Sequence, residues 1–195
     1  MTAKTFVDEQ QLLEDSFRLA RQIHASDFRP DFIVGVWRGG STVGIYVQEC
    51  LQYLGVASDH IPVRTSYSGR DDYLRRLSRR EQVQAHGLQY LYDNLSAGDR
   101  LLIVDDVYST GRHVTAIIEQ LKHHCRRNMA AETRVAAVYF RPPADNETRP
   151  PDYYLHRVDD WLVLPYELTD LGRDEMLVHK PWIVPLLDEL KTDWH

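Results

Sequence analysis

The sequence contains the segment Leu101-Leu102-Ile103-Val104-Asp105-Asp106-Val107-Tyr108-Ser109-Thr110-Gly111-Arg112-His113, in which four apolar residues lead directly into two acids and a Ser-Thr-Gly turn. Four consecutive apolar residues predict a strand that is buried on both faces. Apolar residues then recur at helical spacing from Val114 to Leu121, so we expect the turn to open a helix. The two acids should therefore lie at the carboxyl end of a buried strand, beside a helix N-terminus.

The chemistry of this turn favours a phosphorylated sugar. Free backbone N–H groups at a helix N-terminus attract a phosphate, and the hydroxyls of Ser109 and Thr110 add donors. The adjacent carboxylates of Asp105 and Asp106 can accept hydrogen bonds from a vicinal diol or act through a metal ion. A phosphate site one turn away from a diol site matches a ribose 5-phosphate.

Strands and helices alternate on both sides of this segment. The pattern predicts helices at 8–26, after Gly39-Gly40 as far as Gly55, and at 182–190, and strands at 32–36, 61–67, 135–140 and 161–164. Ser41 or Thr42 can cap the second helix. We therefore predict an α/β fold, with a mostly parallel sheet flanked by helices. Ligands of such sheets bind at the carboxyl ends of the strands.

The composition narrows the classes of function. Hydrophobic residues make up 43% of the chain, which is enough for a buried core, and the formal net charge is -6. An acidic chain is a poor general binder of nucleic acid or membrane surfaces, so we expect neither as a partner. Cys50 and Cys125 have no metal-binding spacing and are interpreted as free thiols. With neither a signal peptide nor a long apolar run, the expected location is the cytoplasm.

The segment around Asp105 and Asp106 resembles the phosphoribosyl diphosphate signature of type I phosphoribosyltransferases. The resemblance implies that both acids meet the ribose hydroxyls, and that the 5-phosphate is held by Ser109, Thr110, Gly111, Arg112 and His113. It also implies a single domain with the fold of that family and a small hood over the sheet. The match extends from about residue 30 to residue 168, and the residues after Leu168 match nothing informative.

The turn departs from the family pattern at two positions. In the 6-oxopurine branch the position of Ser109 usually holds Asp, which is thought to act as general base at the purine N7. A Ser hydroxyl is a poor base, and general base catalysis contributes roughly 10²–10⁴-fold, so proton removal is the expected weak point. His113 stands where Thr or Ser is commonest and could supply a cation to the phosphate or a replacement base.

The segment Trp37-Arg38-Gly39-Gly40 follows the predicted strand at 32–36. Glycines allow close backbone approach, and the planar guanidinium of Arg38 suits a phosphate. The segment resembles the diphosphate-binding loop of purine phosphoribosyltransferases, which implies a cis peptide bond between Trp37 and Arg38.

Two further segments resemble the purine branch. Ser66-Tyr67 resembles the start of a flexible loop, expected at about 66–88, that closes over the substrates. A hood at about 141–170 resembles the base-binding region of xanthine and guanine phosphoribosyltransferases. That resemblance implies that Trp161 stacks on the purine, that backbone groups of Leu162 read its edge, and that Arg141 contacts its 6-oxygen. It also implies that Glu167 helps to hold a magnesium ion, together with Asp105 and Asp106.

The sequence therefore predicts transfer of the 5-phosphoribosyl group from phosphoribosyl diphosphate to a 6-oxopurine, in purine salvage. Asp105, Asp106, Ser109 and Arg38 are the expected catalytic residues, with Mg²⁺ as cofactor. The family also implies a homodimer or homotetramer. Two alternatives stay open. A uracil-type enzyme or RNA-binding regulator of the same fold also lacks Asp at the Ser109 position, and a non-catalytic nucleotide sensor would lack the base altogether.

Overall fold

The computed structural model describes residues 4–65, 83, 85–143 and 148–192, with side chains as far as residue 189. The strands are β1 (Lys4–Phe6), β2 (Phe32–Trp37), β3 (Asp59–Thr65), β4 (Ala85–His86), β5 (Arg100–Tyr108), β6 (Glu132–Phe140), β7 (Tyr153–Arg157) and β8 (Trp161–Val163). The helices are α1 (Glu9–Ala25), α2 (Gly39–Tyr53), α4 (Gln89–Asn94), α5 (Arg112–Cys125), the 3-10 helix η1 (Arg126–Asn128), α6 (Arg173–His179) and α7 (Ile183–Thr192).

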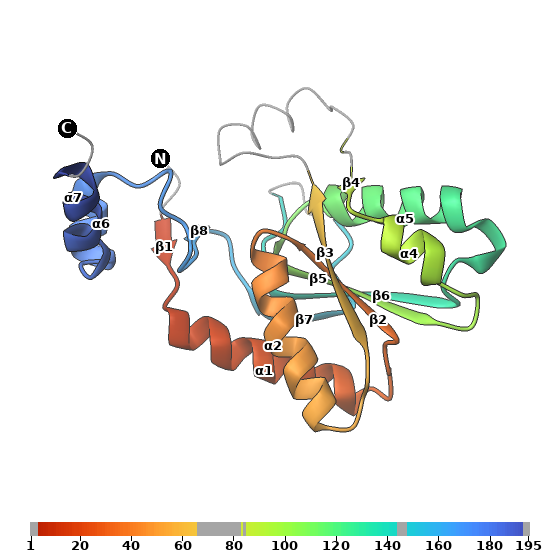
Figure 1. The fold of residues 1–195 in the computed structure, drawn as a ribbon. Helices are drawn as coiled ribbons and strands as arrows, with labels where there is room; N and C mark the ends of the chain where they lie inside the picture. The colour runs from red at the N-terminus through yellow and green to blue at the C-terminus, as the bar shows by residue number, and fades with distance from the viewer. Residues whose placement is uncertain (1–3, 66–82, 84, 144–147, 193–195) are drawn as a thin grey trace.

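The main sheet has six strands in the order β4-β3-β2-β5-β6-β7, and only β4 runs antiparallel to its neighbour. Helices α1 and α2 cover one face, and α4 and α5 cover the other (Figure 1). Apolar side chains of β5 alternate between the two cores, with Leu102 and Val104 on the α1–α2 side and Leu101 and Ile103 on the other. This arrangement confirms the predicted α/β fold.

The strand order reverses between β2 and β5. From β2 the chain adds β3 on one side, while β5 adds β6 and β7 on the other. The two strands pair directly in parallel, with Phe32 opposite Leu101 and Gly35 opposite Val104. Because both strands end at the same edge, the loop after Trp37 lies next to the acids that follow Val104. Crevices at such reversal points are the usual ligand sites of α/β sheets.

The start of α2 differs from the prediction. Ser41 and Thr42 were expected to cap this helix, but the helix already begins at Gly39, and the cap position is Arg38 without a side-chain cap bond. Ser41 is buried inside the first turn, where its hydroxyl donates to the carbonyl of Gly35. Both glycines of this first turn lie close to β5.

Other strand and loop boundaries also differ from the predicted ones. The second predicted strand is β3, which begins at Asp59 rather than at Ile61 and is described as far as Thr65; its predicted end at Ser66 and Tyr67 lies outside the described residues, as do 66–82 and 84 as a whole. The loop was expected to extend to residue 88, but Ala85–His86 pairs with β3 and Leu88 is buried. The short strand β1 was not predicted, and it pairs with β8 in a separate two-stranded parallel sheet.

Cys50 and Cys125 are free thiols, as expected. None of the helices in the described part of the chain is both long and apolar enough to cross a membrane.

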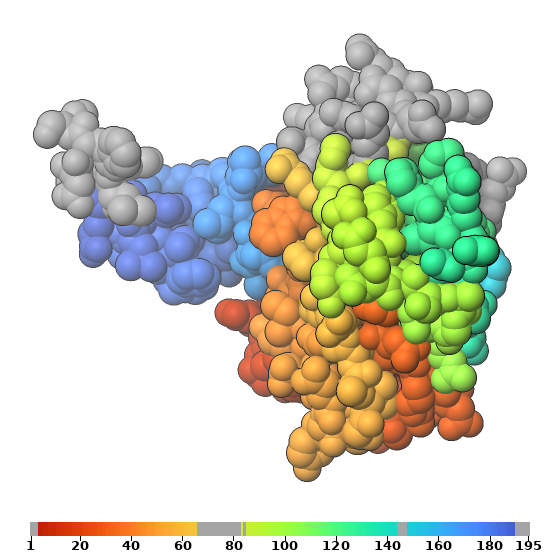
Figure 2. Space-filling view, turned by 45° about the vertical axis from the view of Figure 1, so that its right-hand side comes forward, coloured from red at the N-terminus to blue at the C-terminus, as the bar shows by residue number. Residues whose placement is uncertain are grey.

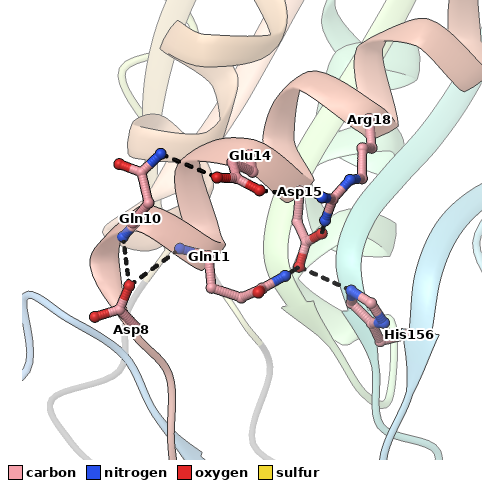
Figure 3. A network of polar contacts seen from close by, with 7 residues as sticks. All are labelled: Asp8, Gln10, Gln11, Glu14, Asp15, Arg18 and His156. Carbon is pink, nitrogen blue, oxygen red and sulfur yellow. Dashed lines mark hydrogen bonds and ion pairs between the residues drawn. The ribbon is translucent and has the colours of Figure 1, made fainter.

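A buried carboxylate joins α1 to β7. Asp15 has no exposed surface, and its oxygens lie 2.7 Å from Gln11 Nε2, 2.6 Å from Arg18 Nη1 and 2.8 Å from His156 Nε2 (Figure 3). Burial alone would raise the pKa of Asp15, but the hydrogen bonds from Gln11, Arg18 and His156 outweigh it and hold the pKa below its usual value. The charged carboxylate is therefore part of the folded state.

We expect Asp15→Asn to destabilise the protein by about 1–3 kcal/mol, because it removes charge-assisted bonds from a buried site. Urea denaturation of the two proteins at neutral pH measures the difference. Glu14→Gln is the control, because Glu14 also binds Arg18 but is exposed, and it should cost less than about 1 kcal/mol. Equal losses in both variants would contradict a structural role for the buried carboxylate.

Candidate active site

A cavity of about 750 Å³ opens at the carboxyl end of the main sheet and extends to β8 and the turn after it. Its lining includes most of the residues that the sequence singled out: Trp37, Arg38, Gly39, Asp105, Asp106, Ser109, Thr110, Gly111, His113, Arg141, Trp161, Leu162 and Glu167. Gly40 and Arg112 do not line it. The structure thus brings segments from four strand ends around one space.

The turn between β5 and α5 has the geometry of an anion site. Gly111 adopts a left-handed conformation with φ of 69° and precedes the first residue of α5. A Cβ at this position would lie 2.3 Å from the hydroxyl oxygen of Tyr108, so both conformation and space favour glycine. Thr110 Oγ1 lies 3.5 Å from the backbone nitrogen of Arg112. The turn therefore directs the N-terminus of a 14-residue helix at the cavity.

The acid pair lies on the last residues of β5. Oδ1 of Asp105 accepts a hydrogen bond from the backbone N–H of Asp106 at 3.1 Å, and Oδ1 of Asp106 accepts one from Val107 at 2.9 Å. Burial raises the pKa of Asp105 well above its usual value, and the charge of Asp106 adds to the effect. Asp105 therefore gives up its proton less readily than an ordinary aspartic acid.

Two glycines allow α2 to contact the acid pair closely. A Cβ on Gly40 would lie 2.4 Å from the carbonyl oxygen of Val104 and 2.9 Å from Cα of Asp105. A Cβ on Gly39 would lie 1.8 Å from Oδ2 of Asp106. Gly40 therefore does not line the cavity itself; it allows α2 to pack closely on β5 beside the acid pair.

The loop after β2 contains the cis peptide bond that the resemblance implied, between Trp37 and Arg38. The side chain of Arg38 is half exposed, and its Nη2 lies 3.4 Å from Oε1 of Glu167. Burial raises the pKa of Glu167, while the backbone N–H of Leu164, 3.0 Å from Oε2, opposes the shift. The guanidinium of Arg38, which follows β2, and the carboxylate of Glu167, in the turn after β8, thus form an ion pair at the cavity.

The aromatic side of the cavity is formed by β8 and the end of β6. The guanidinium carbon of Arg141 lies 4.4 Å from the centre of the Trp161 ring, a cation–π contact. Trp161 itself is held by the pairing of β8 with β1, in which it lies opposite Lys4. The cationic group of Arg141 thus lies over one face of the indole at this wall of the cavity.

His113 lies in the first turn of α5. Its Nδ1 lies 2.5 Å from Oγ1 of Thr65, at the end of β3. Burial lowers the pKa of His113 to about 4, so the ring is neutral at pH 7. A neutral ring carries no positive charge, which argues against the predicted role of His113 as a cation for the phosphate.

This low pKa predicts a pH dependence of stability. The unfolded chain binds a proton at His113 near pH 6.5, whereas the folded chain does so only near pH 4, so stability falls as the pH drops between these values. The loss reaches at most about 3 kcal/mol. Urea denaturation at several pH values should show a shallower loss for His113→Gln, whose side chain stays neutral. Parallel losses in the two proteins would contradict the assignment.

Comparison with known protein families identifies the family of this chain. A model of the phosphoribosyl transferase domain matches residues 2–169. The chain belongs to the phosphoribosyltransferase family. It is therefore a transferase, and the reaction class of its family is phosphoribosyl transfer.

Solved structures of phosphoribosyltransferases have the same fold. The purine phosphoribosyltransferase from Pyrococcus horikoshii Ot3 is 24% identical, with a TM-score of 0.63 over 87% of this chain and 98% of that one. The Helicobacter pylori xanthine-guanine-hypoxanthine phosphoribosyltransferase is 15% identical, with a TM-score of 0.60 over 97% and 99%. A hypothetical protein from Neisseria gonorrhoeae with bound ppGpp is 19% identical, with a TM-score of 0.64 over 93% and 98%. No curated protein sequence is significantly similar.

Phosphoribosyltransferases use Mg²⁺ with phosphoribosyl diphosphate, and the residues of this cavity fit such an ion. Within the described residues, no cluster of three or more His, Cys, Asp or Glu side chains forms a complete metal cage. Mg²⁺ needs none, because it is usually held by one or two carboxylates together with substrate phosphates and water. Asp105, Asp106 and Glu167 all line the cavity and offer the oxygen ligands that Mg²⁺ prefers.

The sequence analysis did not identify two residues that contact the predicted site. The hydroxyl of Tyr166 donates a hydrogen bond to Oδ2 of Asp106, and burial raises the pKa of the phenol above its usual value. Thr65 contacts His113. Tyr166 lies within the predicted hood at about 141–170 and directly before Glu167, so its position beside a predicted site residue was the available signal.

Proposed function

We propose that this phosphoribosyltransferase transfers the 5-phosphoribosyl group of phosphoribosyl diphosphate to a 6-oxopurine. The observation that carries the proposal is the single cavity that joins the acid pair and the N-terminus of α5 to the wall of Trp161 and Arg141. The first part has the chemistry for a ribose 5-phosphate, and the second has the chemistry for a flat, carbonyl-bearing base. The purine names of two structural neighbours support the choice of base.

Each part has a task in this proposal. The turn from Ser109 to His113 holds the 5-phosphate, while Asp105 and Asp106 accept hydrogen bonds from the ribose hydroxyls. Arg38, after β2, binds the diphosphate. As the bond from C1 to the diphosphate breaks, the ribose gains positive charge, which the nearby carboxylates stabilise. A nitrogen of the base, positioned beside C1, then forms the new bond to C1, the diphosphate departs with the electrons of the broken bond, and the base loses its proton to water.

The base is held by the hood. Trp161 stacks on the purine, and backbone groups of Leu162 read its edge. Arg141 leaves the indole to donate a hydrogen bond to the 6-oxygen. Asp105, Asp106 and Glu167 would hold the magnesium ion, which when bound would neutralise charge on the diphosphate leaving group. The proposed enzyme is a cytoplasmic homodimer or homotetramer of purine salvage.

A nucleotide sensor of the same fold is the second candidate. Ser109 lines the cavity where the resemblance leads us to expect a carboxylate base, and one neighbour is a protein with bound ppGpp. A sensor needs the phosphate turn and the acid pair but no base. The same structure would then bind a nucleotide without converting it.

A product assay separates these functions. The purified protein is incubated with phosphoribosyl diphosphate, Mg²⁺ and one of hypoxanthine, guanine, xanthine, adenine or uracil, and the nucleoside monophosphate is measured. The proposal predicts turnover of at least one 6-oxopurine and none of uracil. Uracil turnover would support the uracil-type alternative, which an RNA gel-shift assay would then extend. Nucleotide binding without any turnover would support the sensor.

Restoring the missing base gives a directed prediction. We expect Ser109→Asp to raise kcat for hypoxanthine or guanine by about tenfold or more, because a carboxylate can take the purine proton. Ser109→Asn is the matched control, since its side chain has the same shape but is no base, and it should give no gain. Steady-state kinetics measures both. A gain in the Asn variant, or a loss in the Asp variant with substrate affinity unchanged, would contradict the proposed role of this position.

A further inference from the structure

Lys180 has an unusual set of partners for a lysine. It follows α6 directly, is only 5% exposed, and its Nζ donates to the carbonyl oxygens of Leu164, Pro165 and Glu167 at 2.8, 2.7 and 2.7 Å. An ammonium group has three N–H donors, and all three are satisfied by one short segment of backbone. One side chain thus fixes the turn formed by residues 164–167.

The turn is also closed by its own hydrogen bonds. The backbone N–H of Glu167 donates to the carbonyl of Leu164 at 3.0 Å, and the N–H of Leu164 donates to Oε2 of Glu167 at 3.0 Å. The carbonyl of Leu164 therefore accepts from both Glu167 and Lys180. Because the Lys180 ammonium group and the Glu167 N–H share this acceptor, we expect loss of the ammonium group to shift Glu167 and its carboxylate as well.

Helix α6 holds Lys180 in place from outside the main sheet. Lys4 Nζ of β1 lies 2.6 Å from Glu175 Oε1, and the ring of Phe6 stacks on that of His179 at 3.6 Å between centres. Figures 1 and 2 show α6 and α7 standing to one side of the body that contains the main sheet. Lys180 is the point at which this outer segment contacts the turn.

The turn makes two contacts with the opposite wall of the cavity. The hydroxyl of Tyr166 donates to Asp106, one of the proposed diol acids. Oε1 of Glu167 lies 3.4 Å from Nη2 of Arg38, in the proposed diphosphate loop. Any displacement of the turn therefore displaces groups that face both the ribose and the diphosphate.

We propose that Lys180 is a positioning residue that fixes the 164–167 turn and thereby sets the affinity for phosphoribosyl diphosphate. The inference rests on the proposed function for its ligand, and on the three carbonyl contacts for its mechanism. It assigns a role to the C-terminal segment, which lies beyond the family match at residues 2–169. Loss of the ammonium group removes one donor from each of three carbonyls and leaves only that of Leu164 with a second, the N–H of Glu167, so the turn must then rearrange.

The first test needs no ligand. Amide hydrogen exchange is measured at Leu164 and Glu167 in the wild type and in Lys180→Met, whose side chain has similar length but no donor. We expect exchange at these amides to become about tenfold faster or more in the variant. Arg173→Gln is the control, because it removes the α6–α7 ion pair, at 2.6 Å, without touching the turn. Unchanged protection in Lys180→Met would overturn the inference.

The second test measures the dissociation constant of phosphoribosyl diphosphate by calorimetry, with Mg²⁺ present. Loss of a residue that orients a binding group typically costs 10–100-fold, and we expect a loss in this range for Lys180→Met and a change of less than about twofold for Arg173→Gln. Combined with Glu167→Gln, Lys180→Met should add little, because both act on the same turn. Fully additive losses would overturn a shared mechanism.

The two tests separate this inference from the proposed function. If the wild type does not bind phosphoribosyl diphosphate, the proposed function fails, and amide exchange alone decides whether Lys180 holds the turn. If the wild type binds and Lys180→Met binds equally well, the proposed function survives and the inference fails. Should Lys180→Met not fold, Lys180→Gln replaces it, since a shorter amide still donates to part of the turn and should give an intermediate loss.

Discussion

Replacing Asp105 and Asp106 together by Asn is expected to lower kcat/KM for phosphoribosyl diphosphate by about 10²–10⁴-fold. Each carboxylate is proposed to accept a hydrogen bond from a ribose hydroxyl, and such charged bonds contribute about 1.5–3 kcal/mol each. The same charges stabilise the positive ribose as the diphosphate leaves, so kcat should fall together with affinity. Steady-state kinetics with varied phosphoribosyl diphosphate measures the loss.

The two single variants should differ. Burial and the charge of Asp106 raise the pKa of Asp105, so Asp105 is the less readily charged partner, and Asp105→Asn should cost less than Asp106→Asn. Asp59→Asn is the control, because Asp59 lies at the amino end of β3 and is exposed. Activity of the double variant within threefold of wild type would contradict the assignment of the acid pair.

Gly40→Ala is expected to lower kcat/KM by about 10²-fold without touching any substrate. The added Cβ would lie 2.4 Å from the carbonyl oxygen of Val104, and both of its closest contacts are backbone atoms that cannot rotate away. Helix α2 must therefore move away from β5, and the loop of Arg38 moves with it. A displacement of about 1 Å at a catalytic site costs on the order of 10²-fold.

Gly98→Ala is the matched control, since a Cβ there meets nothing within 4 Å. It should leave both activity and the urea midpoint close to the wild type. If Gly40→Ala retained full activity, the close contact between α2 and β5 would not be what positions the diphosphate loop.

The parts of the fold that could be predicted are those encoded by local pattern. Four apolar residues before Asp105 define β5, and the Ser-Thr-Gly turn marks the start of α5, because strand burial and helix opening both leave local signals. The length of β5 was not predictable in the same way. Val107 and Tyr108 stay in the strand because they pair with Tyr139 and Phe140 of β6, a partner that lies far away in sequence.

The missed features depend on contacts between distant segments. Strand β1 has only three residues and exists because Lys4 pairs opposite Trp161. Ser41 looked like a helix cap, but the helix begins at Gly39, and Ser41 is buried in its first turn. A lone lysine after a short helix gives no sequence signal, and the role of Lys180 appears only when its three carbonyl partners are seen together.

The most direct test of the central claim is a crystal structure of the protein with bound phosphoribosyl diphosphate. We expect density for the 5-phosphate against the backbone N–H groups of residues 109–113, with the ribose diol on Asp105 and Asp106. Density with the 5-phosphate elsewhere in the cavity, or with both carboxylates turned away from the diol, would contradict it.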